Sequence, residues 1–106
     1  MELTKESKKV LFKLYKEYLD RIKSGVSRAD AKVFDPEIIN QTILSEYSSS
    51  DLNDYLCELG TNDYVSNFFG DGVVMHTSLT NSAISEIENR FKNGILDVAE
   101  FISKFI

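Results

Sequence analysis

The sequence is poor in the residue types that build disulfide frameworks and metal cages. It contains one cysteine, Cys57, and one histidine, His76, among 106 residues. One cysteine cannot form an internal disulfide, and one histidine cannot supply a His-based zinc site. These two scarcities exclude a disulfide scaffold, and we expect no metal ion.

Long apolar runs are also missing. No stretch approaches the roughly 18 consecutive apolar residues of a membrane span, and residues 1–6 lack the apolar segment of a secretory signal. We therefore expect a cytoplasmic chain with no membrane partner. Hydrophobic residues make up 42% of the chain and charged residues 27%, which is typical of a globular protein, and the length suits one domain over residues 1–106.

The chain has fewer basic than acidic residues, and the basic residues are concentrated in its first third. Twelve Lys and Arg against seventeen Asp and Glu give a net charge of −5. Residues 1–32 carry nine basic and five acidic side chains, whereas residues 33–106 carry three basic and twelve acidic ones. The molecule should be electrically two-sided. This balance argues against a dedicated nucleic-acid coat, because a basic surplus supplies most of the affinity of such proteins.

Apolar periodicity and capping residues predict several helices and one hairpin. The predicted helices span residues 4–25, 27–34 (a short helical turn), 36–44, 51–60, 80–91 and 95–105. Two strand-like runs, 64–69 and 73–79, flank Gly70-Asp71-Gly72, which is typical of a β-hairpin. Strict alternation in the second run places Met75 on the face of Val73 and Leu79, and we expect Met75 in the core.

The order of these elements indicates a fold class. Three helices followed by a two-stranded hairpin are typical of a winged helix-turn-helix, a mainly α fold with a small β-hairpin. The helices 36–44 and 51–60 would form the helix-turn-helix, and the hairpin would be the wing. An extra C-terminal helix, 95–105, has apolar residues over an arc of roughly 220°, and we expect it to pack on the first helix.

Several runs resemble a known family. Residues 78–84, 88–94 and 101–104 resemble a family of small uncharacterised winged-helix proteins of bacteria and their prophages, and segments such as 14–19 and 28–32 fit the same layout. The resemblance implies a winged-helix fold, which serves DNA readers and protein-docking modules alike. Its motifs are helix caps and core positions, so it implies no catalytic residue.

The outward face of the helix 51–60 is the surface that a helix-turn-helix reader lays in the major groove. With the leucines of this helix facing the core, the outward residues include Asp51, Asn53, Asp54 and Glu58, and the helix has no Lys or Arg. Carboxylates repel DNA phosphates. We predict that these four residues bind a protein partner, and the alternative is a merely solvated acidic face.

Basic side chains follow the first helix instead. Lys5, Lys9, Lys16 and Lys23 fall within about 40° of one another at 100° per residue, and we call them the lysine stripe. One interpretation is a nucleic-acid contact. The other is a solubilising helix exterior with the ion pairs Lys13–Glu17 and Lys16–Asp20.

The last helix is the candidate dimer interface. Its broad apolar arc, like that of the first helix, exceeds what one packing face can cover. We therefore predict a homodimer through Leu96, Phe101, Ile102 and Phe105. The alternative is that this helix fills a groove between the first helix and the helix 80–91.

Catalytic signatures are missing. The sequence has no Gly-x-Ser-x-Gly, Walker or zinc-ligand spacing, and Cys57 and His76 fall on different predicted elements. We expect no enzyme activity, no cofactor and no small-molecule substrate. The predicted function is a non-catalytic winged-helix module of regulatory or adaptor type that acts through protein–protein contacts. The alternative is a DNA-binding protein resembling bacterial or prophage transcription regulators.

Overall fold

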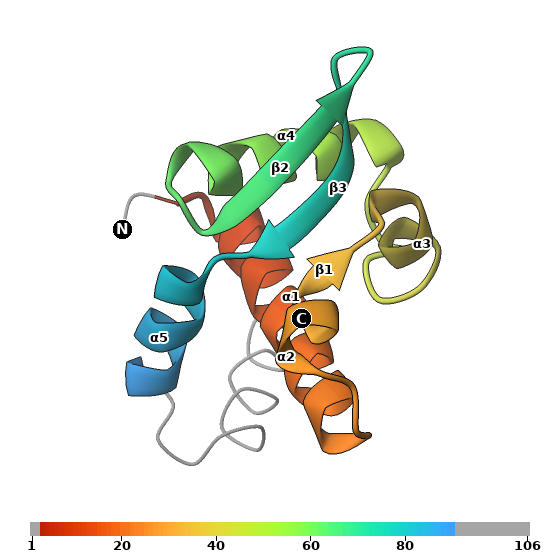
Figure 1. Ribbon diagram of the computed structural model, residues 1–106. Helices are drawn as coiled ribbons and strands as arrows, with labels where there is room; N and C mark the ends of the chain where they lie inside the picture. The colour runs from red at the N-terminus through yellow and green to blue at the C-terminus, as the bar shows by residue number, and fades with distance from the viewer. Residues whose placement is uncertain (1–2, 91–106) are drawn as a thin grey trace.

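The computed structural model describes residues 3–90, in which five helices are combined with one three-stranded sheet (Figure 1). The helices are α1 (Lys5–Lys23), α2 (Arg28–Ala31), α3 (Pro36–Gln41), α4 (Ser49–Thr61) and α5 (Asn81–Arg90), and the strands are β1 (Val33–Phe34), β2 (Val65–Gly70) and β3 (Val73–Leu79). The sheet is antiparallel, with the strand order β1-β3-β2. α4 packs against both strands of the β2–β3 hairpin and against α1, and therefore lies at the centre of the arrangement.

α1 confirms the first predicted helix and both of its ends. Thr4 caps its start by accepting a hydrogen bond from the backbone N–H of Ser7 at 3.4 Å. Gly25 follows its end with a φ of +101°, a conformation that favours a residue without Cβ. The apolar face is buried in a single copy of the chain, through Val10, Leu11, Phe12, Leu14, Tyr15 and Tyr18. These side chains are therefore not available to a second copy.

The short strand β1 is the main departure from the predicted layout. The sequence predicts a helical turn over residues 27–34, whereas α2 is shorter and the next two residues pair with β3. The paired residues are Val33 with Ser78 and Phe34 with Thr77. Pro36 prevents β1 from continuing because proline has no N–H for the ladder, and it begins α3 instead. The fold is therefore mixed α and β, rather than mainly α with a small hairpin.

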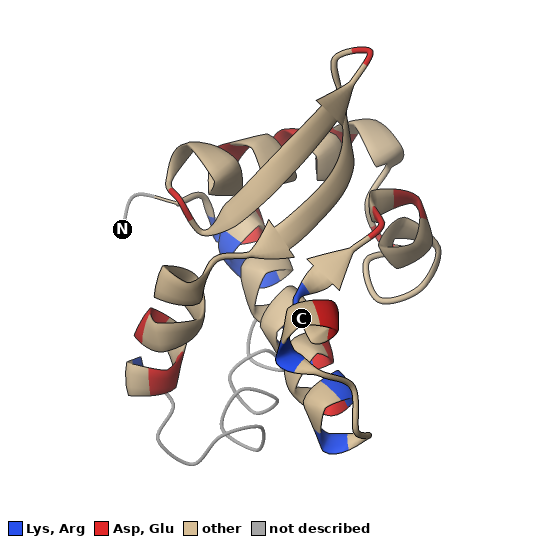
Figure 2. Cartoon of the chain, in the orientation of Figure 1, with Lys and Arg blue, Asp and Glu red and all other residues tan. Residues whose placement is uncertain are grey.

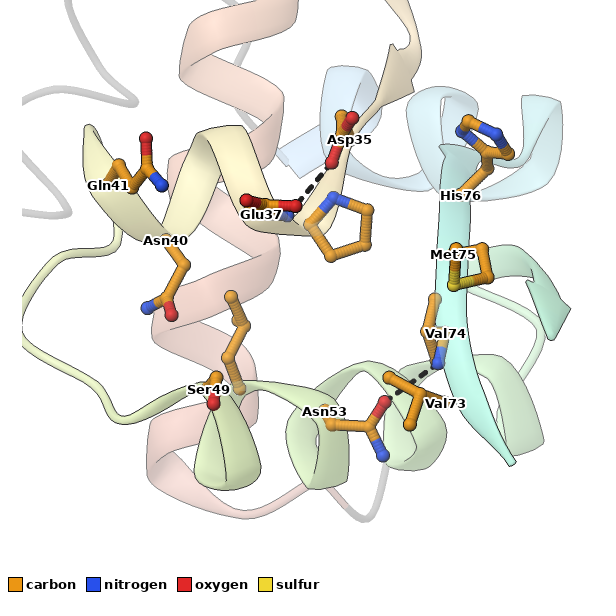
Figure 3. Close-up of a pocket in the computed structure, with 12 residues that line it drawn as sticks. Asp35, Glu37, Asn40, Gln41, Ser49, Asn53, Val73, Val74, Met75 and His76 are labelled. Atoms are coloured by element: carbon orange, nitrogen blue, oxygen red, sulfur yellow. Dashed lines mark hydrogen bonds between the residues drawn. The ribbon is translucent and has the colours of Figure 1, made fainter. Parts of the chain in front are cut away.

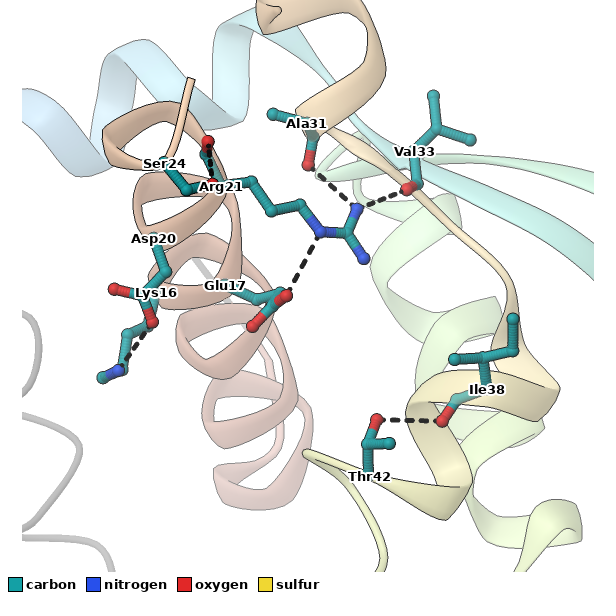
Figure 4. Close-up of polar contacts among 9 residues, drawn as sticks. All are labelled: Lys16, Glu17, Asp20, Arg21, Ser24, Ala31, Val33, Ile38 and Thr42. Atoms are coloured by element: carbon teal, nitrogen blue, oxygen red, sulfur yellow. Dashed lines mark hydrogen bonds and ion pairs between the residues drawn. The ribbon is translucent and has the colours of Figure 1, made fainter. Parts of the chain in front are cut away.

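Arg21 fastens β1 to α1 (Figure 4). Its Nη1 donates to the carbonyls of Val33 at 2.8 Å and Ala31 at 3.3 Å, and its Nε donates to the Glu17 carboxylate at 3.2 Å. The guanidinium carbon lies 4.5 Å from the centroid of the Phe34 ring. This set of contacts needs the planar, multi-donor guanidinium, which lysine does not offer.

Side-chain caps begin both helices of the predicted helix-turn-helix pair. Asp35 Oδ1 accepts from the N–H of Glu37 at 2.9 Å, and Ser48 Oγ accepts from the N–H of Asp51 at 3.1 Å. Pro36 follows Asp35 at the first helical position, where its missing N–H leaves no helical hydrogen bond unmade, and the helix begins at residue 36 as predicted. The predicted helix 51–60 is present as α4, which starts at Ser49 rather than at residue 51.

The connection between α3 and α4 is longer than predicted. α3 ends at Gln41 rather than at about residue 44. The amide of Asn40 donates to the carbonyls of Leu44 at 3.0 Å and Tyr47 at 2.9 Å, which satisfies backbone groups of this loop. Leu44 is fully buried, so the loop still contributes to the core.

The β2–β3 hairpin confirms the predicted turn. Asp71 and Gly72 have φ values of 53° and 78°, and Gly70 pairs with Val73 on either side of them. A two-residue turn with both φ values positive is the type I′ geometry, which matches the twist of the flanking strands and favours Asp-Gly.

An extra residue in β3 changes which of its side chains reach the core. Phe68 pairs with His76 and Phe69 pairs with Val74, which leaves Met75 without a partner in β2. Because neighbouring side chains point to opposite faces, this bulge reverses the alternation. Val74 is buried, whereas Met75 is 50% exposed. The prediction that Met75 lies in the core is wrong.

α5 completes the described residues. Thr80 caps it by accepting from the N–H of Ala83 at 3.1 Å, which agrees with the predicted start of the helix 80–91. No helix within residues 3–90 is long and apolar enough to cross a bilayer. The predicted helix 95–105 and its packing on the first helix lie outside the described residues. So do the residues predicted to form the dimer interface, namely Leu96, Phe101, Ile102 and Phe105.

Candidate interaction surface

Of the four α4 residues predicted to bind a partner, some are free at the surface and others are engaged within the chain. Asp51 and Asp54 are exposed on the solvent side of the helix. Asn53 instead accepts a hydrogen bond from the N–H of Val74 at 2.8 Å, through its Oδ1 (Figure 3). This bond satisfies a backbone group of β3 immediately before the bulge at Met75 and positions the hairpin on α4. Asn53 is thus a positioning residue, and the two aspartates remain available for contact.

Glu58 holds the beginning of α1 to α4. Its Oε2 accepts from the backbone N–H of Thr4 at 2.7 Å, and its Oε1 accepts from the Thr4 hydroxyl at 3.0 Å. Burial opposes ionisation, but the hydrogen bonds from Thr4 and Ser7 outweigh it and lower the pKa of the Glu58 carboxyl. The predicted partner-binding role of Glu58 therefore competes with a structural one.

Ion pairs within the chain neutralise half of the lysine stripe. Lys9 lies 3.5 Å from the carboxylate of Glu46, and Lys16 lies 2.9 Å from that of Asp20, as predicted (Figure 4). The two stripe lysines at the ends of α1, Lys5 and Lys23, are exposed and form no ion pair within residues 3–90. The stripe therefore presents less free charge than its lysine count implies.

The predicted ion pair between Lys13 and Glu17 is replaced by two others. Lys13 lies 2.6 Å from Glu46 in the α3–α4 loop, and Glu17 pairs with Arg21 at 3.2 Å. Burial works against the charged form of Glu46, but the hydrogen bond from Lys13 and the nearby lysine charges lower the pKa of this carboxyl. Lys13 therefore pairs with the α3–α4 loop and not with Glu17, the residue four positions along its own helix.

A groove between α3, α4 and β3 is a feature that the sequence did not predict (Figure 3). Its volume is about 320 Å³. Pro36 of α3, Leu52 of α4 and Val74 of β3 give it an apolar lining, and Asn40 and His76 add polar groups. The groove exists because β1 stops at Phe34, so that the next part of β3 is flanked by α3 rather than by a strand.

The charge around this groove is of one sign. Asp35 and Glu37, at the start of α3, belong to its lining. Residues 33–89 contain no Lys or Arg at all. Figure 2 shows acidic positions and no basic ones on α3, α4 and the hairpin tip, whereas α1 and α2 carry basic positions interspersed with acidic ones and α5 carries both. The basic side chains of the described residues are therefore concentrated on α1 and α2, and the surface around the groove is acidic.

The hairpin exposes apolar side chains beside the groove. Phe68 is 66% exposed and Phe69 50%, while Val73 and Met75 at the groove edge are similarly accessible. Phe68 lies beside the groove residue His76, with ring centroids 6.2 Å apart, whereas Phe69 lines a separate depression with Cys57. Adjacent strand residues point to opposite faces, so a hairpin with one buried face leaves one of the two exposed. Clustered apolar exposure of this kind is typical of interaction sites.

Cys57 and His76 are not brought together. Cys57 lines a second, open depression beside β2, whereas His76 lines the groove beside α3. Within residues 3–90 no group of three or more His, Cys, Asp or Glu side chains is arranged to hold a metal ion.

Comparison of the chain with family models, with curated proteins and with solved structures found no match. A functional assignment therefore rests on the geometry and charge described above.

Proposed function

We propose that the chain is a winged helix-turn-helix module of regulatory or adaptor type that acts through protein–protein contacts. The order of the elements supports this fold assignment. α3 and α4 follow β1 as the helix pair, and the β2–β3 hairpin then takes the place of the wing. The strand β1, which pairs with β3, adds the third strand of a small sheet packed on the helices.

The charge of the surface formed by α4 and the hairpin carries the functional proposal. In a winged-helix DNA reader this surface would contact the duplex. Here it presents the exposed carboxylates of Asp51 and Asp54 and an acidic turn at Asp71, and it has no Lys or Arg (Figure 2). Protein–DNA affinity depends on neutralising phosphates with cations. The hairpin also exposes Phe68 and Phe69 on its two faces, and aromatic side chains are enriched at protein interfaces.

A fluorescence-anisotropy titration with mixed-sequence duplex DNA tests this function. We expect no binding of the full chain at either low or moderate salt, because the candidate surface repels phosphates. Binding with a steep salt dependence would overturn the proposal in favour of the DNA-binding alternative.

The lysine stripe defines the variants for that experiment. Lys5→Glu with Lys23→Glu removes the two stripe charges that form no ion pair within residues 3–90. Lys8→Glu is the control, because Lys8 lies on the same helix outside the stripe. Duplex binding that is lost in the stripe variant and retained in the control would establish DNA binding through α1.

A further inference from the structure

We propose that the groove between α3, α4 and β3 binds a short peptide segment of a partner protein, in which an apolar side chain lies next to lysine or arginine. This inference rests on the proposed protein-binding function and assigns that function a site and a ligand class.

The size and lining of the groove favour a peptide side chain as its occupant. A volume of about 320 Å³ is at the lower end of the range for ligand sites, and it suits one or two side chains. Pro36, Leu52 and Val74 come from three different elements and provide an apolar floor and walls. An aliphatic or aromatic side chain inserted here would bury apolar area against these three residues.

The charge of the groove requires a cation beside that apolar anchor. Glu37 is exposed at its edge, and Asp35 has one carboxylate oxygen engaged by the N–H of Glu37 (Figure 3). The adjoining face of α4 adds the exposed carboxylates of Asp51 and Asp54. None of the residues that line the groove is Lys or Arg, and residues 33–89 contain none, so a cation on the partner would meet carboxylates without a lining counter-charge.

The surface next to the groove extends the site beyond a single side chain. Val73 is 51% exposed and Met75 is 50% exposed, and both also line the groove. On the α3 side of β3, β1 pairs only with Thr77 and Ser78, so residues 73–76 have no neighbouring strand there. An extended segment can therefore follow β3 out of the groove across exposed apolar side chains. This continuity favours a peptide over an isolated small molecule.

Selection from a phage-displayed random peptide library against the immobilised full chain tests the proposal. We expect the selected sequences to combine a large apolar residue with flanking lysine or arginine. A synthetic, fluorescein-labelled copy of the most enriched peptide is then titrated with the protein. Its affinity should weaken as salt increases, because part of the attraction is electrostatic.

Two groove variants and two matched controls locate the peptide. Glu37→Lys reverses a charge at the groove edge, and Val73→Asp places a charge on its exposed apolar rim. The controls are Glu88→Lys on α5 and Ile38→Asp on α3, which are exposed and lie outside the groove. We expect each groove variant to weaken binding by about tenfold or more, and each control by less than about twofold.

The outcomes separate this inference from the function on which it rests. Peptides that bind equally well to the groove variants and the wild type would overturn the groove as the site while supporting a protein-binding module. No enrichment, or enrichment of acidic sequences, would overturn the ligand class. Duplex DNA binding in the titration described above would overturn the proposed function itself.

Discussion

At the scale of single residues, Asn67 joins α4 to the hairpin. Its Nδ2 donates to the carbonyl of Leu56 at 2.8 Å, and its Oδ1 accepts from the hydroxyl of Thr77 at 2.8 Å. Thr77 is fully buried, so losing this partner would leave a polar group without compensation. The side chain of Asn67 fits because Gly60 lies opposite. A Cβ at position 60 would approach Asn67 Nδ2 to 2.5 Å.

We therefore predict that Gly60→Ala destabilises the protein, although alanine is the better helix former. Helix propensity alone favours alanine by up to about 1 kcal/mol. Displacing Asn67 from its buried hydrogen bonds costs about 1–3 kcal/mol, and the net loss should be about 1–2 kcal/mol. Urea unfolding followed by circular dichroism measures it.

Repeating the Gly60→Ala change in the Asn67→Ala protein shows whether the clash with Asn67 causes the loss of stability. In Asn67→Ala, which should itself be destabilised, the added methyl group at position 60 no longer meets an amide. We expect Gly60→Ala to be neutral or stabilising there, which makes the two changes strongly non-additive. The control is Ser66→Ala, an exposed neighbour on the same strand. Additive losses in the double variant would contradict this explanation.

At the scale of elements, two carboxylates tie α1 to its neighbours. Glu58 binds the start of α1 from α4, and Glu46 binds Lys13 from the α3–α4 loop. The pKa of each carboxyl is lowered from its ordinary value of 4.5 in the folded protein. A lowered folded-state pKa stabilises the protein above the unfolded pKa, and this contribution is lost as the pH falls through the folded value.

We predict that the free energy of unfolding decreases as the pH falls below about 4.5, with a smaller decrease in the variants Glu58→Gln and Glu46→Gln. Each variant should also be less stable than the wild type at neutral pH. Urea midpoints measured over a pH series give both quantities. Glu37→Gln is the control, because its carboxylate accepts no hydrogen bond within residues 3–90. A variant slope equal to that of the wild type would contradict the assignment.

Elements whose signals are local were predictable from the sequence, and those that depend on distant partners were not. The caps at Thr4, Asp35 and Thr80 and the Asp71-Gly72 turn need only a few neighbouring residues, and all are present. β1 has two residues and exists because β3 pairs with it. The bulge at Met75 likewise depends on the register against β2. Neither β1 nor the bulge produces a periodic pattern of apolar residues that could be recognised in the sequence.

At the scale of the whole molecule, the sequence predicts that the candidate surface is acidic, but it does not predict the groove. Counting charged residues was enough to locate the acidic side, because the basic residues of the described part lie almost entirely in its first third. The groove brings together α3, α4 and β3, and its existence depends on where β1 stops. Helical projection also could not show that Asn53 and Glu58 are engaged by β3 and by the start of α1. Those contacts are tertiary.

The predicted homodimer can be distinguished from charge-driven association. A basic α1 and the acidic surface of α3, α4 and the hairpin would attract copies of the chain at low salt, but such contacts are screened as salt increases. A dimer formed through Leu96, Phe101, Ile102 and Phe105 would be apolar and should persist at high salt. We expect light scattering at high micromolar concentration to give the mass of two chains at both salt levels.

The double variant Phe101→Glu with Phe105→Glu should give the mass of one chain, while circular dichroism retains its helical signal. Ile38→Glu, an exposed apolar control on α3, should remain dimeric. A single-chain mass for the wild type, or a mass that halves as salt is added, would contradict the apolar interface.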